Sequence, residues 1–172
     1  MTAQATFTHR PLTEPEARTL YALIKLTPNI LGYTMYELLR FRDVWVAEVG
    51  GKLAGVCIAI DMPLGWTEFA ALCVADEFRG MGIGSELFDR AWKTSLERGR
   101  RIFVMSRHPS VLTMMRAHGM TMRKNPLFAP LSVQLYNTWH MSSRYRWKEL
   151  IRKEPMRRAD GLPTFEFGVY KP

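Results

Sequence analysis

A glycine-rich segment, Arg79-Gly80-Met81-Gly82-Ile83-Gly84-Ser85, holds the residues of this chain that are best suited to chemistry. An apolar run from Phe69 to Val74 precedes it, and a helical apolar pattern opens at Ser85. Glycines let a ligand approach the backbone N–H groups closely, and a helix start adds unpaired donors and the positive end of a dipole. Arg79 adds a full charge and a forked donor. The segment therefore predicts a site for a phosphate or pyrophosphate.

Three phosphate-binding patterns can be compared with this segment. The dinucleotide fingerprint needs G-x-G-x-x-G, and Gly80, Gly82 and Gly84 have a different spacing. A P-loop needs a Lys before a Ser or Thr, and Gly84-Ser85-Glu86 lacks the Lys. The string Val74-Ala75-Asp76-Glu77-Phe78-Arg79-Gly80-Met81-Gly82-Ile83-Gly84 resembles the acyl-CoA pyrophosphate loop of the GCN5-related N-acetyltransferase (GNAT) superfamily. The remaining alternative is a glycine-rich turn that binds nothing.

The resemblance implies an enzyme that transfers an acetyl group from acetyl-CoA, its co-substrate, to an amine of a small molecule or protein. The amine would attack the thioester directly, without an acyl-enzyme. The backbone N–H of Val74 is matched to the thioester carbonyl, and the loop backbone with the Ser85 hydroxyl is matched to the pyrophosphate. The residues expected to contact acetyl-CoA are Leu72, Cys73, Val74, Arg79, Gly80, Met81, Gly82, Ile83, Gly84 and Ser85.

The acid and the base of the reaction are less well marked. The family often uses a strand carboxylate that acts through water, which makes Glu68 the candidate base, although an ordinary surface carboxylate fits equally well. Met115 stands where the family commonly has an acidic Tyr, and His108 stands where it often has Asn. A thioether cannot protonate a thiolate. Either His108 or Ser106 serves as the acid, or the thiolate leaves without help, or the chain is a poor catalyst; a helix cap or surface imidazole is the preferred interpretation of His108.

The elements that must position these residues can be read from apolar periodicity. Strands are predicted at 7–10, 44–49, 53–60, 66–75, 101–106 and 164–170, and helices at 13–26, 33–39, 85–98 and 109–118. Gly50-Gly51 predicts a hairpin, and Gly99 and Gly119 predict helix ends. The order resembles the GNAT fold, an α/β class with a mixed, mostly antiparallel central sheet flanked by helices. In that family the strand before the loop separates from the strand after the next helix, and pantetheine lies in the gap.

The last third of the chain departs from the family and predicts a basic helical insertion at about 125–160, before the last strand. Apolar residues at helical spacing indicate one helix from about Ser132 to Lys153 with a buried face. The members of that face are Leu135, Trp139, Ser143, Trp147 and Leu150. Packing on the domain's own core is the preferred interpretation, while an acceptor-site wall and a homodimer contact stay open.

Composition bounds the remaining choices. The 172 residues, 47% of them hydrophobic, predict one folded domain over 1–172. The first residues show no signal-peptide pattern, and the longest apolar run is too short to span a bilayer, so a cytoplasmic protein with no membrane partner is expected. Cys57 and Cys73 are expected to be buried, reduced thiols. No His/Cys cluster has metal-ligand spacing, so no metal is predicted.

Two further function classes remain alongside the acetyltransferase. The first is a catalytically weak GNAT-fold protein that binds CoA or serves in assembly, which the residue Met115 keeps open. The second is a nucleic-acid-binding module, since the net charge is +8 and basic residues crowd the segment 144–158. The chain contains no recognisable nucleic-acid motif, so a solvated helix is the preferred interpretation of that charge.

Overall fold

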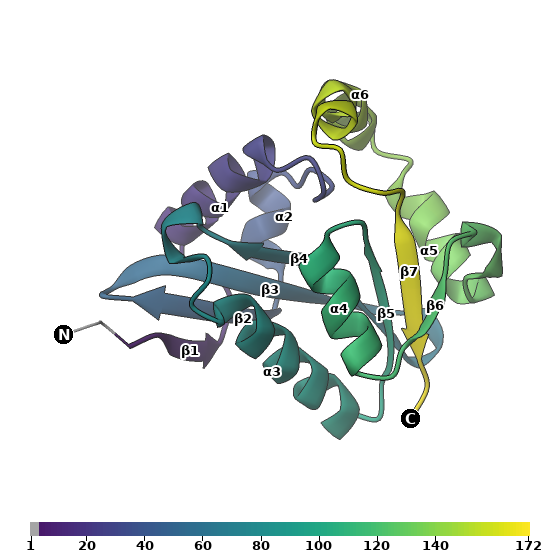
Figure 1. Cartoon of the computed structure of the whole chain (residues 1–172), viewed down its shortest axis with the longest axis horizontal. Coiled ribbons are helices and arrows are strands. Elements are labelled where there is room, and N and C mark those ends of the chain that lie inside the picture. Colours follow the sequence, from purple (N-terminus) through teal and green to yellow (C-terminus); the bar gives the residue numbers. More distant parts are fainter. Residues whose placement is uncertain (1–3) are drawn as a thin grey trace.

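A seven-stranded mixed sheet with the strand order β1-β2-β3-β4-β5-β7-β6 organises the chain (Figure 1). The computed structural model describes residues 4–172; residues 1–3, which belong to the stretch examined for a signal peptide, lie outside the described part. In chain order the elements are β1 (Thr6–His9), α1 (Glu14–Leu26), α2 (Met35–Arg40), β2 (Asp43–Val49), β3 (Lys52–Met62), β4 (Trp66–Val74), α3 (Ile83–Glu97), β5 (Arg101–Ser106), α4 (Pro109–Ala117), β6 (Thr121–Arg123), α5 (Leu131–His140), α6 (Arg144–Ala159) and β7 (Glu166–Tyr170).

The pairing of β4 with β5 is short and parallel, in contrast to every other pair in the sheet. It comprises Trp66 with Arg101, Thr67 with Ile102, and Glu68 with Phe103. β1 to β4 pair antiparallel in sequence, and β7 pairs antiparallel with both β5 and β6. The two strands therefore separate beyond Glu68, which confirms the predicted mixed, mostly antiparallel fold class and the predicted gap.

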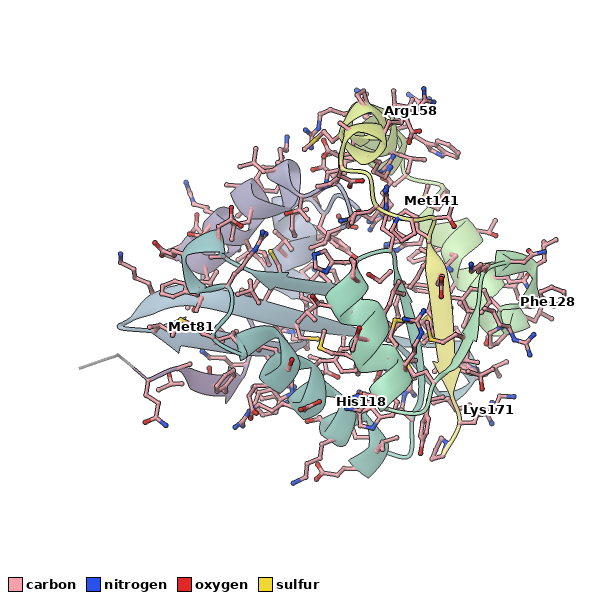
Figure 2. All side chains as sticks on the ribbon, in the orientation of Figure 1. Met81, His118, Phe128, Met141, Arg158 and Lys171 are labelled. Carbon is pink, nitrogen blue, oxygen red and sulfur yellow. The ribbon has the colours of Figure 1, made fainter. Side chains whose placement is uncertain are left out.

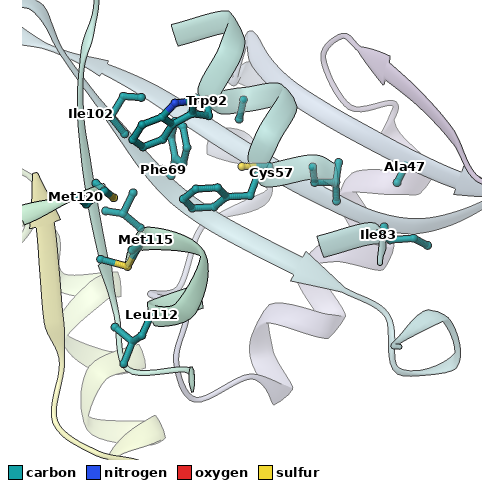
Figure 3. Close-up of a cluster of buried hydrophobic side chains, with 14 of the residues drawn as sticks. Ala47, Cys57, Phe69, Ile83, Trp92, Ile102, Leu112, Met115 and Met120 are labelled. Carbon is teal, nitrogen blue, oxygen red and sulfur yellow. The ribbon is translucent and has the colours of Figure 1, made fainter. Parts of the chain in front are cut away.

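Helices cover both faces of the sheet because its strands alternate apolar side chains between two cores. Ala47 of β2 belongs to the core with α3 and α4, whereas its neighbour Val46 belongs to the core with α1 and α2. The first core contains Phe69, Trp92 and Met115 and is drawn in Figure 3. The register between β3 and β4 shifts at Ala70, which has no partner on β3. Phe69 and Ala71 of β4 therefore enter different cores.

Local sequence signals account for most element boundaries. Gly50 and Gly51 have positive φ angles of 58° and 76°, as the predicted hairpin between β2 and β3 requires. Gly99 and Gly119 follow α3 and α4 with positive φ, and Pro109 is the first residue of α4. The start of α3 was predicted two residues too late, because Gly82 in the left-handed region already serves as its N-cap.

The insertion differs most from the prediction. A single helix over 132–153 is wrong: α5 ends at His140 and α6 begins at Arg144. The predicted buried face is wrong as well, because Trp139 is 71% exposed and Trp147 is 51% exposed. Leu135 is also exposed, while Ser143 and Leu150 are half-buried. The short strand β6 was not predicted.

Charged side chains form the buried face of α6 instead. Arg146, Glu149 and Lys153 are its buried residues. The Lys153 Nζ donates to the carbonyls of Ile24 and Ile30 at 2.6 and 2.7 Å. Because α6 packs on backbone carbonyls at the end of α1 and in the loop that follows, it needs donors there and not apolar groups.

Candidate active site

The separation of β4 from β5 opens a cavity of about 430 Å³. Its wall combines the free half of β4, the end of β5, the glycine loop, the start of α4 and the loop after α1. The lining residues are Thr27, Asn29, Ile30, Phe69, Ala70, Ala71, Leu72, Cys73, Val74, Phe78, Arg79, Gly80, Gly82, Ile83, Gly84, Ser85, Phe88, Val104, Met105, Ser106, His108, Ser110, Val111 and Met114. The cavity thus brings together nine of the ten residues that were expected to contact acetyl-CoA.

Met81 is the expected contact that does not line the cavity. Its side chain is 48% exposed and lies at the outer edge of the loop (Figure 2). Gly80 and Gly82, on either side of Met81, both adopt left-handed φ angles, 78° and 77°. Only glycine adopts that region without strain, which explains both positions.

The glycine loop presents the start of α3 to the cavity. Gly82 caps this helix without a side-chain acceptor, so no side chain occupies the donors of the first turn at the cap. Arg79 lies at the rim, 66% exposed, and its Nη2 contacts Asp76 Oδ1 at 2.7 Å. A phosphate at this position would meet backbone N–H groups, the positive end of the helix dipole and a guanidinium.

The free edge of β4 can bind an extended ligand. Beyond Glu68 this strand pairs only with β3 in the described sheet, so its β5-facing backbone groups border the cavity. Two thiols lie in this part of the sheet, Cys57 and Cys73, and both are buried and unpaired, as predicted. Burial raises the pKa of Cys73 to about 11, so it is a neutral thiol at pH 7.

Glu68 occupies the last pair before the strands separate, opposite Phe103. It is half-buried, and this burial raises the pKa of its carboxyl to about 7, with Arg146 opposing the shift. Glu68 therefore lies where the gap begins; it does not itself line the cavity, but it is next in sequence to Phe69 of the cavity wall. A carboxyl group with a pKa near neutrality can accept a proton at physiological pH.

An aromatic and charged cluster faces Glu68 from the insertion and the segment before α2. Arg146 pairs with Glu37, and its Cζ lies 5.1 Å from the centroid of the Tyr33 ring. Tyr136 stacks on His140 with ring centroids 5.3 Å apart. Burial lowers the pKa of His140 to about 4, so this imidazole is neutral at pH 7. Burial raises the pKa of Tyr136 to about 12, and the Glu68 charge adds to that shift.

The candidate acids lie at the end of β5 and in the short connection to α4. Ser106 and His108 both line the cavity, and the Ser106 Oγ accepts a hydrogen bond from the His108 backbone N–H at 3.1 Å. Met115 is fully buried in the core, and the cavity wall contains its neighbour Met114 instead. A Cβ placed on Gly168 would lie 2.9 Å from the Met115 Cε, so this thioether packs tightly against β7.

Sequence reasoning missed the contribution of the loop after α1. Thr27, Asn29 and Ile30 line the cavity, and the Asn29 Oδ1 is buried without a hydrogen-bond partner in the described chain. The Thr27-Pro28-Asn29 sequence indicated only that a helix ends there. In the part of the chain that the structure describes, no group of three or more His, Cys, Asp or Glu side chains could hold a metal ion. No helix in residues 4–172 is long and apolar enough to cross a membrane.

Comparison with known proteins supports the family assignment. Residues 40–119 match the model of the acetyltransferase (GNAT) domain, which spans β2 to the end of α4. No curated protein sequence matches the chain. The resemblance that the glycine loop indicated is confirmed.

Solved structures with low sequence identity share the fold. The Rv2747 protein of Mycobacterium tuberculosis in complex with CoA has a TM-score of 0.68 at 16% identity, over 96% of this chain and 99% of that one. N-acetylglutamate synthase of Neisseria gonorrhoeae, complexed with coenzyme A and N-acetyl-glutamate, has a TM-score of 0.66 at 14% identity, and the match covers 100% of this chain but 36% of that one. The ribosomal-protein-S18-alanine N-acetyltransferase of Escherichia coli has a TM-score of 0.61 at 12% identity, over 97% of this chain and 93% of that one.

Proposed function

Residues 40–119 belong to the GNAT acetyltransferase family, and we propose that the chain is an N-acetyltransferase that moves an acetyl group from acetyl-CoA to an amine. The observation that carries the proposal is the cavity between β4 and β5. The glycine loop borders this cavity, and Glu68 lies where the two strands separate. The donor-rich glycine loop suits a pyrophosphate, and the titratable carboxyl of Glu68, next to Phe69 of the cavity wall, suits the reacting amine.

Different groups of the chain would bind the different parts of acetyl-CoA. Backbone N–H groups from Arg79 to Gly84, with the Ser85 hydroxyl, would hold the pyrophosphate. The unpaired edge of β4 would hydrogen-bond the pantetheine amides, as a neighbouring strand does. The backbone N–H of Val74 would stabilise the negative charge that develops on the thioester oxygen, an interaction worth about 3 kcal/mol when preorganised.

The reaction needs one proton removed and one proton supplied. The amine nitrogen forms a bond to the thioester carbonyl carbon, the C–S bond breaks, and CoA leaves as a thiolate. Glu68 accepts the amine proton, directly or through water, in its ionised form above a pKa of about 7. The thiolate takes its proton from His108, from Ser106 or from solvent at the end of β5.

We place the acceptor on the side of β4 that faces Tyr33, Tyr136 and His140. The Glu68 charge acts on Tyr33 and Tyr136, and His140 stacks on Tyr136. All three residues come from the insertion or the segment before α2, outside the part of the chain that matches the family model. The acceptor is an amine of a small molecule or of a protein. The Tyr33 hydroxyl donates to the carbonyl of Ala70 at 3.3 Å, which links this side of the site to the cavity wall.

The test is release of the CoA thiol from acetyl-CoA across a panel of small amines and amino-terminal peptides. Calorimetry with CoA on the same preparation measures binding separately. We expect binding without any acceptor and thiol release with at least one acceptor class. Absence of CoA binding by a folded protein contradicts the proposal.

A second candidate function is a CoA-binding protein with little turnover. The specific observation that favours it is Met115, which stands at the position of the family's acidic Tyr and is buried away from the cavity wall. CoA binding with no thiol release across the whole panel would favour this candidate.

A further inference from the structure

The end of β5 separates the acetyl-CoA cavity from a second cavity of about 260 Å³. Side chains alternate along extended backbone, so Ser106 and His108 line the first cavity while Arg107 lines the second. The second cavity lies among the C-terminal part of α6, the segment that leads to β7, and Arg107. Its lining residues are Arg107, Glu154, Arg157, Arg158, Leu162, Pro163, Thr164 and Phe165.

Arg107 is held rigidly at this cavity and keeps an unused donor. Its side chain is 8% exposed. The Nη2 donates to the Arg157 carbonyl at 3.2 Å, to Asp160 Oδ1 at 2.7 Å and to the Leu162 carbonyl at 2.7 Å. The Nε is buried and has no hydrogen-bond partner within residues 4–172. A buried charged donor without an acceptor is costly, so the guanidinium beside this cavity keeps part of its hydrogen-bonding capacity unsatisfied.

The charges around the cavity favour an anion. Arg157 and Arg158 contribute two further guanidinium groups, and Glu154 contacts both of them, at 3.2 and 3.0 Å. With Asp160 on Arg107, three cations face two carboxylates. The Phe165 ring, whose centroid lies 5.8 Å from the Arg107 Cζ, adds an apolar wall.

We propose that this second cavity binds an oxyanion group, a phosphate or a carboxylate, of a molecule other than acetyl-CoA. Arg107 faces away from the cavity of its neighbours Ser106 and His108, so a CoA molecule bound there would not supply the anion. The source is either the acceptor or a free anion. The proposal does not depend on acetyl transfer, because the anion can bind without turnover.

The experiment is a calorimetric titration of the full-length protein with inorganic phosphate, in the absence of acetyl-CoA. Arg158→Gln removes a rim charge that is 80% exposed, so the variant is expected to fold. Arg107→Lys keeps the charge but loses the guanidinium fork. Arg18→Gln is the matched control, because Arg18 is also exposed and also pairs with a glutamate four residues away, on α1. Each cavity variant should bind phosphate about tenfold more weakly, and the control should equal the parent.

Two further measurements identify the source of the anion. Competition by phosphate against the amine acceptor would assign the cavity to the acceptor, and non-competitive behaviour would assign it to a free anion. The affinities for CoA and dephospho-CoA should respond identically to Arg158→Gln. A selective loss for CoA would place its 3′-phosphate here and overturn the proposal. Equal phosphate affinity in the parent, Arg158→Gln and a folded Arg107→Lys would overturn it as well.

Discussion

α3 and α6 are helices of similar length that bury opposite kinds of side chain. α3, at the glycine loop, buries Leu87, Phe88 and Trp92 and presents charged residues to solvent. α6, in the insertion, buries Arg146 and Lys153, while the other side of the helix exposes apolar side chains. The difference arises from what each helix packs on: α3 lies on the apolar side chains of the sheet, and α6 lies on backbone carbonyls.

The carbonyls that α6 contacts belong to the end of α1 and the loop after it. The last turn of a helix leaves carbonyl groups without intrahelical donors and carries the negative end of the dipole. Arg152 donates to the carbonyl of Lys25 at 2.8 Å, and Lys153 donates to that of Ile24 at 2.6 Å. Because this loop also lines the cavity between β4 and β5, the cations of α6 hold one wall of the candidate site in place.

The largest expected effect is that of a substitution at Glu68, which lies between the glycine-loop side of the sheet and the insertion. Glu68→Gln removes the proton acceptor and should lower turnover about 1,000-fold while CoA affinity stays near that of the parent. The parent rate should rise with pH through about 7 and then level, because a carboxyl with that pKa is protonated and inactive below it. The rise should disappear in the variant.

The control for this prediction is Glu77→Gln, which alters an exposed carboxylate beside the glycine loop. Its turnover and pH profile should match those of the parent. Identical pH–rate profiles for the parent and Glu68→Gln would assign Glu68 to structure.

The sequence predicted the burial of α3 well and that of α6 poorly, for physical reasons. Phe88 and Trp92 recur at helical spacing over a sheet whose strands alternate, so local periodicity already indicates their burial. Trp139 and Trp147 also recur at helical spacing, yet they are exposed. What buries Lys153 is a set of carbonyls more than a hundred residues away along the chain, and no local pattern reports that.

The candidate site shows the same division. The glycine loop and β4 could be predicted because their glycines and apolar run are contiguous in sequence. Asn29 could not, because it reaches the cavity only through the packing of the loop after α1. Met115 could be placed on α4 by its spacing from Gly119, but its direction into the core depends on how α4 packs against Gly168.

The second prediction tests the glycine loop. Gly82→Asp places a carboxylate where backbone must approach a pyrophosphate and should weaken CoA binding roughly 100-fold. The positive φ of Gly82 strains any other residue, so a second variant is needed to isolate the charge. Gly82→Asn has nearly the same shape and the same tolerance for this φ, and it should bind CoA much better than Gly82→Asp. Calorimetry that gives equal affinities for the two variants would contradict a phosphate site here.

The third prediction tests whether buried cations hold α6. Lys153→Met removes the bonds to Ile24 and Ile30, which leaves the Ile30 carbonyl without its donor and the Ile24 carbonyl with only the Thr27 N–H, and this should destabilise the fold by about 2 kcal/mol. Lys148→Met, on the exposed side of the same helix, should change the stability by less than about 0.5 kcal/mol. Urea unfolding of the parent and the two variants measures both values. If Lys153→Met proved as stable as the parent, packing alone would hold this helix.

The smallest expected effect concerns the exposed charges of α6. Arg144 and Lys148 are exposed and lie four residues apart, on one face of α6. Arg152 shares that face but also bonds Glu149 and the carbonyl of Lys25, so its reversal would disturb packing as well. Arg144→Glu combined with Lys148→Glu should therefore leave the melting temperature and CoA affinity nearly unchanged. If this face recruits an anionic acceptor, the acceptor KM should rise in the double variant, and the parent KM should depend strongly on salt. A large fall in melting temperature would instead show that these charges, like Lys153, stabilise the helix.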